Sequence, residues 1–412
     1  MKAVASIALL SWRYLWSRPL QAALNLLLLA LGLALVTLVL LVGTQVDRGF
    51  ERDVQGIDMV VGAKGSPLQL ILAGVFHIDV PPGNIALADF QALQRNPLVA
   101  QAIPLSLGDS FGGFRIVGTT PQYPAHYGAA LEQGALWQAP LQAVLGADVA
   151  RSMAAGAAEG GSLLGRRFVG SHGLGGGGHA HGDHPYTVSG VLAPCGCVLD
   201  RLMLTSTESV WQVHESAQAD DPDDLAVLRE EREITLALVR WRSPLAAVTL
   251  PRAINAGTPM QAAVPAVEIT RLVRLLGVGA DMLRALGGVL LGVAGLSVFI
   301  ACWNAVRERQ ADLALLRLLG APRTRVAGVI AAEALWLALL ATLLGLALGH
   351  ALAGLAGHWL GAEGSMPLTG ALWLPQEWAV PALALGIAGL AALLPVVRAY
   401  RTDVADLLAR PA

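Results

Sequence analysis

Four long apolar stretches dominate the hydrophobic pattern of this chain, and they are unevenly spaced. The first extends from Pro19 to Val46, and the other three lie between Ala285 and Val397. A helix needs roughly 20 apolar residues to cross a bilayer core about 30 Å thick, and each stretch reaches that length. The pattern therefore predicts four transmembrane helices, at residues 19–46, 281–306, 326–357 and 378–397, with a large domain of residues 47–280 inserted after the first.

The inserted domain has the mixed pattern of an α/β fold. Short or alternating apolar runs predict strands at Asp58–Val61, Gly113–Gly118, Tyr186–Leu192, Arg201–Thr205 and Ile234–Arg242. Helices are predicted at Ile85–Gln94, Leu141–Ala154, Glu208–Ser216 and Leu245–Asn255. The last of these has Ser243 as its expected cap and Pro244 in its first turn. The acidic run from Asp220 to Asp224 is expected to be an exposed loop.

Composition and charge give the expected orientation. Hydrophobic residues make up 55% of the chain and charged residues 14%, whereas soluble proteins average near 45–50% and about 25%. Basic residues concentrate in the segments 1–18, 307–325 and 398–412, whereas the short connection 358–377 carries Glu363 and Glu377. The positive-inside rule then places both termini and the 307–325 connection in the cytoplasm. The predicted fold class is an α-helical membrane protein with four transmembrane helices and a large mixed α/β periplasmic domain between helices 1 and 2.

The segment before the first span predicts a helix of its own. Residues 1–18 mix Trp12, Tyr14 and Trp16 with Arg13 and Arg18, which is typical of an amphipathic helix at the cytoplasmic interface. A plain continuation of the first span is the alternative. The span itself is too long for the apolar region of a signal peptide, and we expect it to be retained.

Small and ionisable residues within the spans indicate packing more than a path for solutes. Glycines recur at helix-packing intervals, in the pairs Gly288 and Gly292, Gly345 and Gly349, and Gly386 and Gly389. Glu333 lies about two turns into the third span, where we expect a structural or coupling role. The sequence places no series of ionisable residues across the membrane centre, which argues against an ion-driven carrier.

Catalytic motifs are scarce. The segment Gly62–Ser66 lacks the glycine spacing of a phosphate-binding loop, and Lys2 and Lys64 are the lysines of the chain. The sequence contains neither a Gly-x-Ser-x-Gly nor a His-Glu-x-x-His motif. We therefore expect no enzyme activity and no ATPase site in this chain, and no nucleic-acid partner.

One segment, the His/Gly-rich loop of residues 170–184, has the composition of a metal site. Imidazole and carboxylate groups at short spacing can bind Zn²⁺ or another borderline divalent ion. The candidate ligands are His172, His179, His181, Asp183 and His184, together with Cys195 and Cys197 from the Pro-Cys-Gly-Cys segment that follows. The two cysteines have the alternative of a disulfide, and the loop has the alternative of a solvated hairpin tip with incidental histidines. His77, His126 and His214 are isolated in sequence and are expected to be structural.

The connection between the second and third spans carries the most specific motif. The run Arg307-Glu-Arg309-Gln-Ala-Asp312-Leu-Ala-Leu-Leu-Arg317-Leu-Leu-Gly320-Ala resembles the coupling segment of FtsX-like, MacB-type ABC permeases. Glu333-Ala334 and the run from Pro395 to Asp403 resemble further segments of that family, with Val404 in place of the expected proline. The order of one span, a large domain and three spans also resembles the family, so the similarity covers the whole chain.

This resemblance implies a permease without bound cofactor, located in the bacterial inner membrane among its lipids. Such permeases work as dimers with two cytosolic ATPase subunits, which bind ATP and Mg²⁺ and drive movements of the periplasmic domain, a process called mechanotransmission. We expect a separate ATPase chain, a homodimer in preference to a heterodimer, and a periplasmic substrate or partner protein. The coupling residues that the resemblance implies are Arg309, Leu313, Leu316, Arg317, Leu319, Gly320 and Glu333.

Two alternatives remain at this stage. A signalling subunit of the FtsX type would use the same movement to regulate a periplasmic partner such as a cell-wall hydrolase. A component of periplasmic metal handling would use the His/Gly-rich loop, with zinc as the possible ligand.

Overall fold

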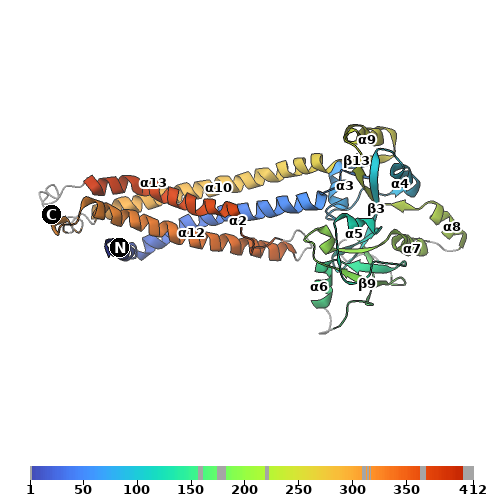
Figure 1. The fold of residues 1–412 in the computed structure, drawn as a ribbon, viewed down its shortest axis with the longest axis horizontal. Helices are drawn as coiled ribbons and strands as arrows, with labels where there is room; N and C mark the ends of the chain where they lie inside the picture. The colour runs from blue at the N-terminus through green and yellow to red at the C-terminus, as the bar shows by residue number, and fades with distance from the viewer. Residues whose placement is uncertain are drawn as a thin grey trace. The chain divides into compact units, whose positions relative to one another are not determined.

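The computed structural model describes residues 2–155, 161–173, 182–218, 222–308, 312, 315, 317–361 and 368–401. The chain divides into two compact units (Figure 1). The helical unit comprises Met1–Val46, Leu276–Leu360 and Leu368–Ala412, and the α/β unit comprises Asp47–Leu275 and Gly361–Pro367. This division confirms a large domain inserted after the first span.

Four helices of the helical unit are long and apolar enough to cross a membrane. The candidate spans are Pro19–Val54, Asp281–Glu308, Arg323–Trp359 and Pro375–Arg401. They belong to helices α2 (Pro19–Val54), α10 (Pro265–Glu308), α12 (Arg323–Gly361) and α13 (Ala379–Arg401), the last preceded by a short 3-10 turn, η2 (Pro375–Trp378). The four spans predicted from sequence are confirmed.

Two of these helices extend well past the length of a bilayer core. Helix α2 has 36 residues and α10 has 44. At 1.5 Å per residue they are about 54 and 66 Å long, against a core of about 30 Å. Both continue without a break from the apolar span into residues of the α/β unit.

The N-terminal segment forms a separate helix, α1 (Lys2–Leu15). Residues Trp16–Arg18 form a turn before α2 begins, so the alternative of one continuous first helix is wrong. Helix α1 packs on α12, because Trp12 and Trp336 meet edge to face at 5.2 Å and the Trp336 indole N–H donates to the Ala8 carbonyl at 3.3 Å.

One of the three predicted glycine pairs packs helices closely within the chain. A Cβ added at Gly345 would lie 2.7 Å from the Leu33 Cβ, and one at Gly349 would lie 2.6 Å from the Thr37 Cβ. Helices α2 and α12 therefore approach each other at these glycines. The packing prediction is wrong for the other two pairs within one chain, since a Cβ there would meet no atom of the described residues within 4 Å. These are Gly288, Gly292, Gly386 and Gly389.

The α/β unit is built on a mixed sheet with the strand order β13-β1-β12-β3-β4-β10-β6-β9-β5, in which β7 also pairs with β9 and β8 with β3. Its strands are β1 (Met59–Ala63), β3 (Val99–Phe111), β4 (Phe114–Thr119), β5 (Leu131–Gly134), β6 (Gln142–Leu145), β7 (Arg167–Phe168), β8 (Ser171–His172), β9 (Tyr186–Leu192), β10 (Leu202–Ser206), β12 (Leu236–Trp241) and β13 (Met260–Ala263). A separate pair joins β2 (Ile85–Ala86) and β11 (Glu233–Ile234).

The helices of this unit cover two apolar clusters. One cluster includes Met59, Phe90 and Leu250, and the other includes Leu145, Met153 and Tyr186. The helices are α3 (Pro67–Gly74), α4 (Leu87–Gln94), α5 (Gln122–His126), α6 (Ala147–Ala155), α7 (Thr207–Gln218), α8 (Pro222–Glu230) and α9 (Pro244–Gly257), with a 3-10 turn η1 (Val198–Arg201).

Two local predictions in this unit were wrong. The helix expected at Leu141–Ala154 is strand β6 followed by α6, with Gly146 packed against the Leu199 carbonyl between them. Asp223 and Asp224 belong to the first turn of α8, where their charge favours the helix N-terminus, and not to a loop. Asp220 and Asp221 lie outside the described residues. Ser243 is the N-cap residue of α9 and Pro244 lies in its first turn, as predicted, although the Ser243 side chain makes no capping hydrogen bond to the described residues.

Candidate functional site

The connection between α10 and α12 carries exposed leucine side chains. Helix α10 ends at Glu308 and α12 begins at Arg323. Between them, the Leu319 N–H donates to the Leu315 carbonyl and the Gly320 N–H to the Arg317 carbonyl, each at 3.0 Å. Gly320 has φ +90°, so this helical turn ends in the left-handed conformation that glycine adopts without strain.

The exposed side chains of this turn are Leu315 (61% exposed), Leu318 (60%) and Leu319 (77%). Of the predicted coupling residues, Arg317, Leu319 and Gly320 lie in this turn. Arg309, Leu313 and Leu316 lie outside the described residues. Leu318 was not among the predicted coupling residues, although the sequence shows that it lies beside Leu319.

Glu333 is buried at the same end of the helical unit. It is 6% exposed and lines a cavity of about 40 Å³ together with residues of α2 and α10. Arg18 and Glu308 line the same cavity and form an ion pair with each other. Asn25 of α2 also accepts a hydrogen bond from the Ser297 hydroxyl of α10 at 2.5 Å. Glu333 therefore lies where the ends of α2, α10 and α12 converge, and its structural or coupling role stays a prediction.

The last residues of α2 are embedded in the α/β unit. The Asp53 carboxylate accepts a hydrogen bond from the Val198 N–H at 2.9 Å. The Asp53 backbone carbonyl accepts another from the Tyr127 hydroxyl at 2.8 Å. The neighbouring Arg52 guanidinium donates to the Gly196 carbonyl. Cys195 and Cys197 form a disulfide around Gly196, so the disulfide alternative holds and their thiolates are not available as metal ligands.

A cluster of three metal-ligand side chains lies on another part of the sheet. Strand β8 pairs with β3 so that His172 is directly opposite Asp109, which puts both side chains on one face. Helix α7 packs against β3 and β4 and adds His214. The His172 Nδ1 lies 3.2 Å from one Asp109 oxygen and the His214 Nε2 lies 3.8 Å from the other.

This arrangement corrects the expectation that His214 is isolated. The His172 and His214 rings are 5.1 Å apart, and one ligand atom from each of the three residues lies within 4.8 Å of the others. Neither Asp109 nor His214 was predicted as a ligand. Asp109 could be found only by predicting how the strands pair, because residues 109 and 172 are neighbours through the register of β3 and β8.

The other predicted metal ligands do not join this cluster within the described chain. The His184 Nε2 is 2.8 Å from the Ser216 hydroxyl, and Asp183 is exposed. His179 and His181 lie outside the described residues. Burial, together with the nearby Asp109 carboxylate, raises the pKa of the Tyr186 hydroxyl.

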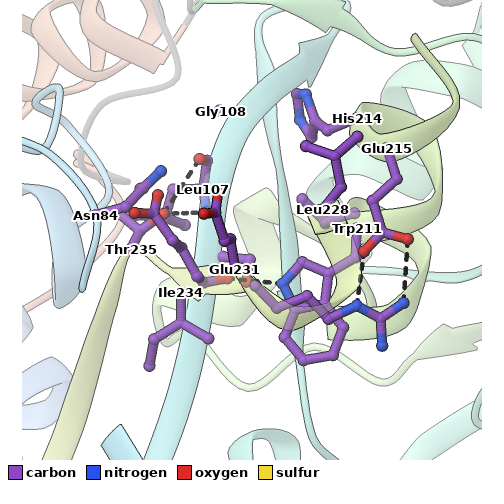
Figure 2. A pocket seen from close by; sticks show the side chains of 14 residues that line it. Asn84, Leu107, Gly108, Trp211, His214, Glu215, Leu228, Glu231, Ile234 and Thr235 are labelled. Carbon is purple, nitrogen blue, oxygen red and sulfur yellow. Dashed lines mark hydrogen bonds and ion pairs between the residues drawn. The ribbon is translucent and has the colours of Figure 1, made fainter. Parts of the chain in front are cut away.

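His214 also lines a polar pocket of about 240 Å³ (Figure 2). In this pocket the Arg232 guanidinium binds both oxygens of Glu215, at 2.6 and 3.1 Å, and lies 4.7 Å from the centre of the Trp211 ring. Figure 2 shows this paired interaction below His214, with Asn84 and Thr235 on the opposite side. Of the acids that line the pocket, Glu215 is thus paired with an arginine.

Comparison with known proteins agrees with this architecture. A family model for the MacB-like periplasmic core domain matches residues 22–270, more than half of the chain, and a model for the FtsX-like permease C-terminal region matches residues 284–404. No curated protein matches the chain.

Two solved structures are similar. One is the periplasmic region of MacB from Actinobacillus actinomycetemcomitans, with 14% identity, a TM-score of 0.34, and coverage of 54% of this chain and 95% of that chain. The other is the extracellular domain of the noncanonic ABC-type transporter YknZ from Gram-positive bacteria, with 15% identity, a TM-score of 0.30, and coverage of 50% and 98%. On the strength of the two family models, the chain belongs to the FtsX/MacB-type family of ABC transporter permeases.

Proposed function

We propose that this permease couples ATP hydrolysis by a separate cytosolic ATPase to movements of its α/β unit, and that these movements export or extract a periplasmic or membrane-held substrate. The observation that carries the proposal is the helical turn at Leu315–Gly320, with three exposed leucines beside Arg317. Exposed apolar side chains next to a cation suit docking into a groove on a partner protein, because the apolar contacts supply affinity and the charge orients them.

Helix packing supports a mechanical route from this turn to the α/β unit. The turn leads directly into α12, which packs closely on α2 at Gly345 and Gly349. Helix α2 then continues to Asp53, whose backbone and side chain are hydrogen-bonded within the α/β unit. A displacement of α12 would therefore be passed to α2 by steric contact, since packed interfaces are not continuously deformable.

The substrate, in this proposal, is handled by the α/β unit and does not pass between the spans. We further propose two permease copies with two ATPase subunits, both termini in the cytoplasm, and the α/β unit in the periplasm of a bacterial inner membrane. The basic residues of the segments 1–18 and 307–325 support this orientation.

The docking proposal is tested by purifying the tagged permease from native membranes and measuring the ATPase activity that accompanies it. Mass spectrometry identifies any subunit with a Walker A motif. Replacing Leu318 and Leu319 by Asp places two charges in the docking surface and should lower the associated ATPase at least tenfold, because truncating an interface hot spot costs about 2 kcal/mol or more. The matched control is Leu245→Asp on α9, at a leucine of similar exposure (63%).

The docking surface would be rejected if the double variant kept the wild-type level of associated ATPase activity. It would also be rejected if the Leu245→Asp control lost as much ATPase activity as the double variant. Insertion and folding of each variant are checked by membrane fractionation and size-exclusion chromatography.

A further inference from the structure

We propose that Asp109, His172 and His214 form a binding site for a divalent cation of the zinc type. The site goes beyond the coupling function, which needs no metal. It also differs from the loop-centred site expected from the sequence, because two of its three ligands come from β3 and α7 and lie far from the loop along the chain.

The spacing of the ligand atoms fits a small tetrahedral ion. Bonds of about 2.0–2.2 Å in tetrahedral geometry place ligand atoms roughly 3.3–3.5 Å apart. The His172 and His214 nitrogens lie 3.2 and 3.8 Å from the two different oxygens of Asp109, and one ligand atom from each of the three residues lies within 4.8 Å of the others. Small side-chain movements would therefore place one Asp109 oxygen and the two imidazole nitrogens around a single ion.

The donor set selects the class of cation. Two imidazole nitrogens and one carboxylate oxygen suit Zn²⁺ and neighbouring transition metals, whereas Ca²⁺ and Mg²⁺ prefer oxygen ligands alone. Three protein ligands leave a fourth position open to water or to another group, as in sites that exchange their ligands, and unlike the closed four-ligand sites that serve structure alone.

Burial gives the site a fixed anionic base and an accessible side. The Asp109 side chain is 2% exposed, whereas those of His172 and His214 are 46% and 30% exposed. A carboxylate withdrawn from water is held more favourably when a cation faces it. The half-exposed imidazoles give an ion a direct path from solvent.

The position of the three residues gives binding a structural consequence. A bound ion would link β8, β3 and α7, three elements that are otherwise held together by packing and by a short strand pairing. A bound ion would hold His172 of β8 against β3 and α7.

The experiment uses the full chain, carrying a tag without histidines, in lipid nanodiscs after removal of metal by EDTA. Zn²⁺ is titrated against a chromophoric chelator, and Co²⁺ serves as a spectroscopic probe because its visible absorption reports tetrahedral nitrogen and oxygen ligation. We expect one ion per chain and an affinity at least tenfold lower in His214→Ala and in Asp109→Asn. His126→Ala is the matched control, since His126 contacts the Gln55 carbonyl elsewhere in the same unit.

The loop-centred alternative predicts a different ranking of variants. If His179→Ala with His181→Ala abolished zinc binding while His214→Ala bound as tightly as the wild type, the three-residue site would be wrong. Absence of zinc binding and of cobalt absorption in the wild type would also overturn it, and would leave an ion pair between imidazoles and Asp109. Thermal unfolding of the metal-free proteins checks that His214→Ala is folded, and His214→Gln replaces it if it is not.

Discussion

The contact between α2 and α12 at Gly345 and Gly349 allows a sharp test of how the helical unit is held together. An added Cβ at Gly345 would lie 2.7 Å from the Leu33 Cβ and 3.1 Å from the Ala30 carbonyl oxygen. At Gly349 it would lie 2.6 Å from the Thr37 Cβ and 3.0 Å from the Ala34 oxygen. Backbone atoms are among these neighbours, so side-chain rotation alone cannot relieve the overlap.

The expected loss of stability follows from the distances. Carbon atoms pack at about 3.5–4.0 Å, so a methyl group at either position must move the helices apart by about 1 Å. Overpacking of this kind costs about 1–3 kcal/mol per site. Replacing a glycine inside a helix by alanine also returns about 0.8–1.0 kcal/mol of helix propensity per site.

The pair Gly386 and Gly389 on α13 provides the control. A Cβ at either of them would meet no described atom within 4 Å, so a double alanine variant there gains the same helix propensity without overlap. The propensity contribution cancels when the two double variants are compared. The variant at 345 and 349 should therefore be less stable than the variant at 386 and 389 by about 2–6 kcal/mol, the overpacking of two sites.

The comparison is made by equilibrium unfolding of the full chain in mixed detergent micelles, followed by tryptophan fluorescence. A difference in unfolding free energy below about 1 kcal/mol between the double variants would refute the close packing of α2 on α12. It would also remove the steric route by which α12 is proposed to move α2.

The sequence predicted the helical unit well because a membrane span has a strong local signature. Each span is a long run of apolar residues, and the four runs fall within the helices that the structure contains. The ends of α2 and α10 were less predictable. Residues 47–54 are mostly charged, and their helix is stabilised by hydrogen bonds of Arg52 and Asp53 to residues 196–198, far along the chain.

The α/β unit was predicted in part, for the same physical reason. Strands with several buried apolar residues, such as β9 and β12, were found from their pattern. Strand β3 was missed, since Pro104, Gly108 and Asp109 interrupt its apolar pattern. Its middle is buried between β12 and β4, and this tertiary context overrides the low strand propensity of those residues.

The proposed cation site depends on contacts that composition alone does not reveal. The His/Gly-rich loop drew attention to His172 because histidines are concentrated there. Asp109 and His214 lie near His172 because of a strand register and the packing of α7. Neither the register nor the packing can be predicted from the local sequence. Cys195 and Cys197 were plausible ligands because they are close to the loop in sequence, but both sulfurs are bonded to each other in the disulfide.

Two further predictions address orientation and the response to acid. With the native cysteines replaced, Val227→Cys should react with a membrane-impermeant maleimide added to the periplasmic side, and Thr324→Cys only after the cells are opened; the reverse pattern would invert the proposed topology. Burial, with the nearby Arg115 and Arg201, lowers the pKa of His77 well below its ordinary value, so the folded protein keeps this imidazole neutral. The unfolded chain binds a proton there below about pH 6.5, and stability should therefore fall as the pH drops below that value, by about 1.4 kcal/mol per pH unit for one proton. Asn tolerates the positive φ of +56° at this position, so His77→Asn should fold and should reduce the slope by one proton between about pH 6 and pH 5. Urea unfolding at several pH values measures both slopes, and identical slopes would mean that His77 is not the buried neutral group that the structure places beside Tyr123.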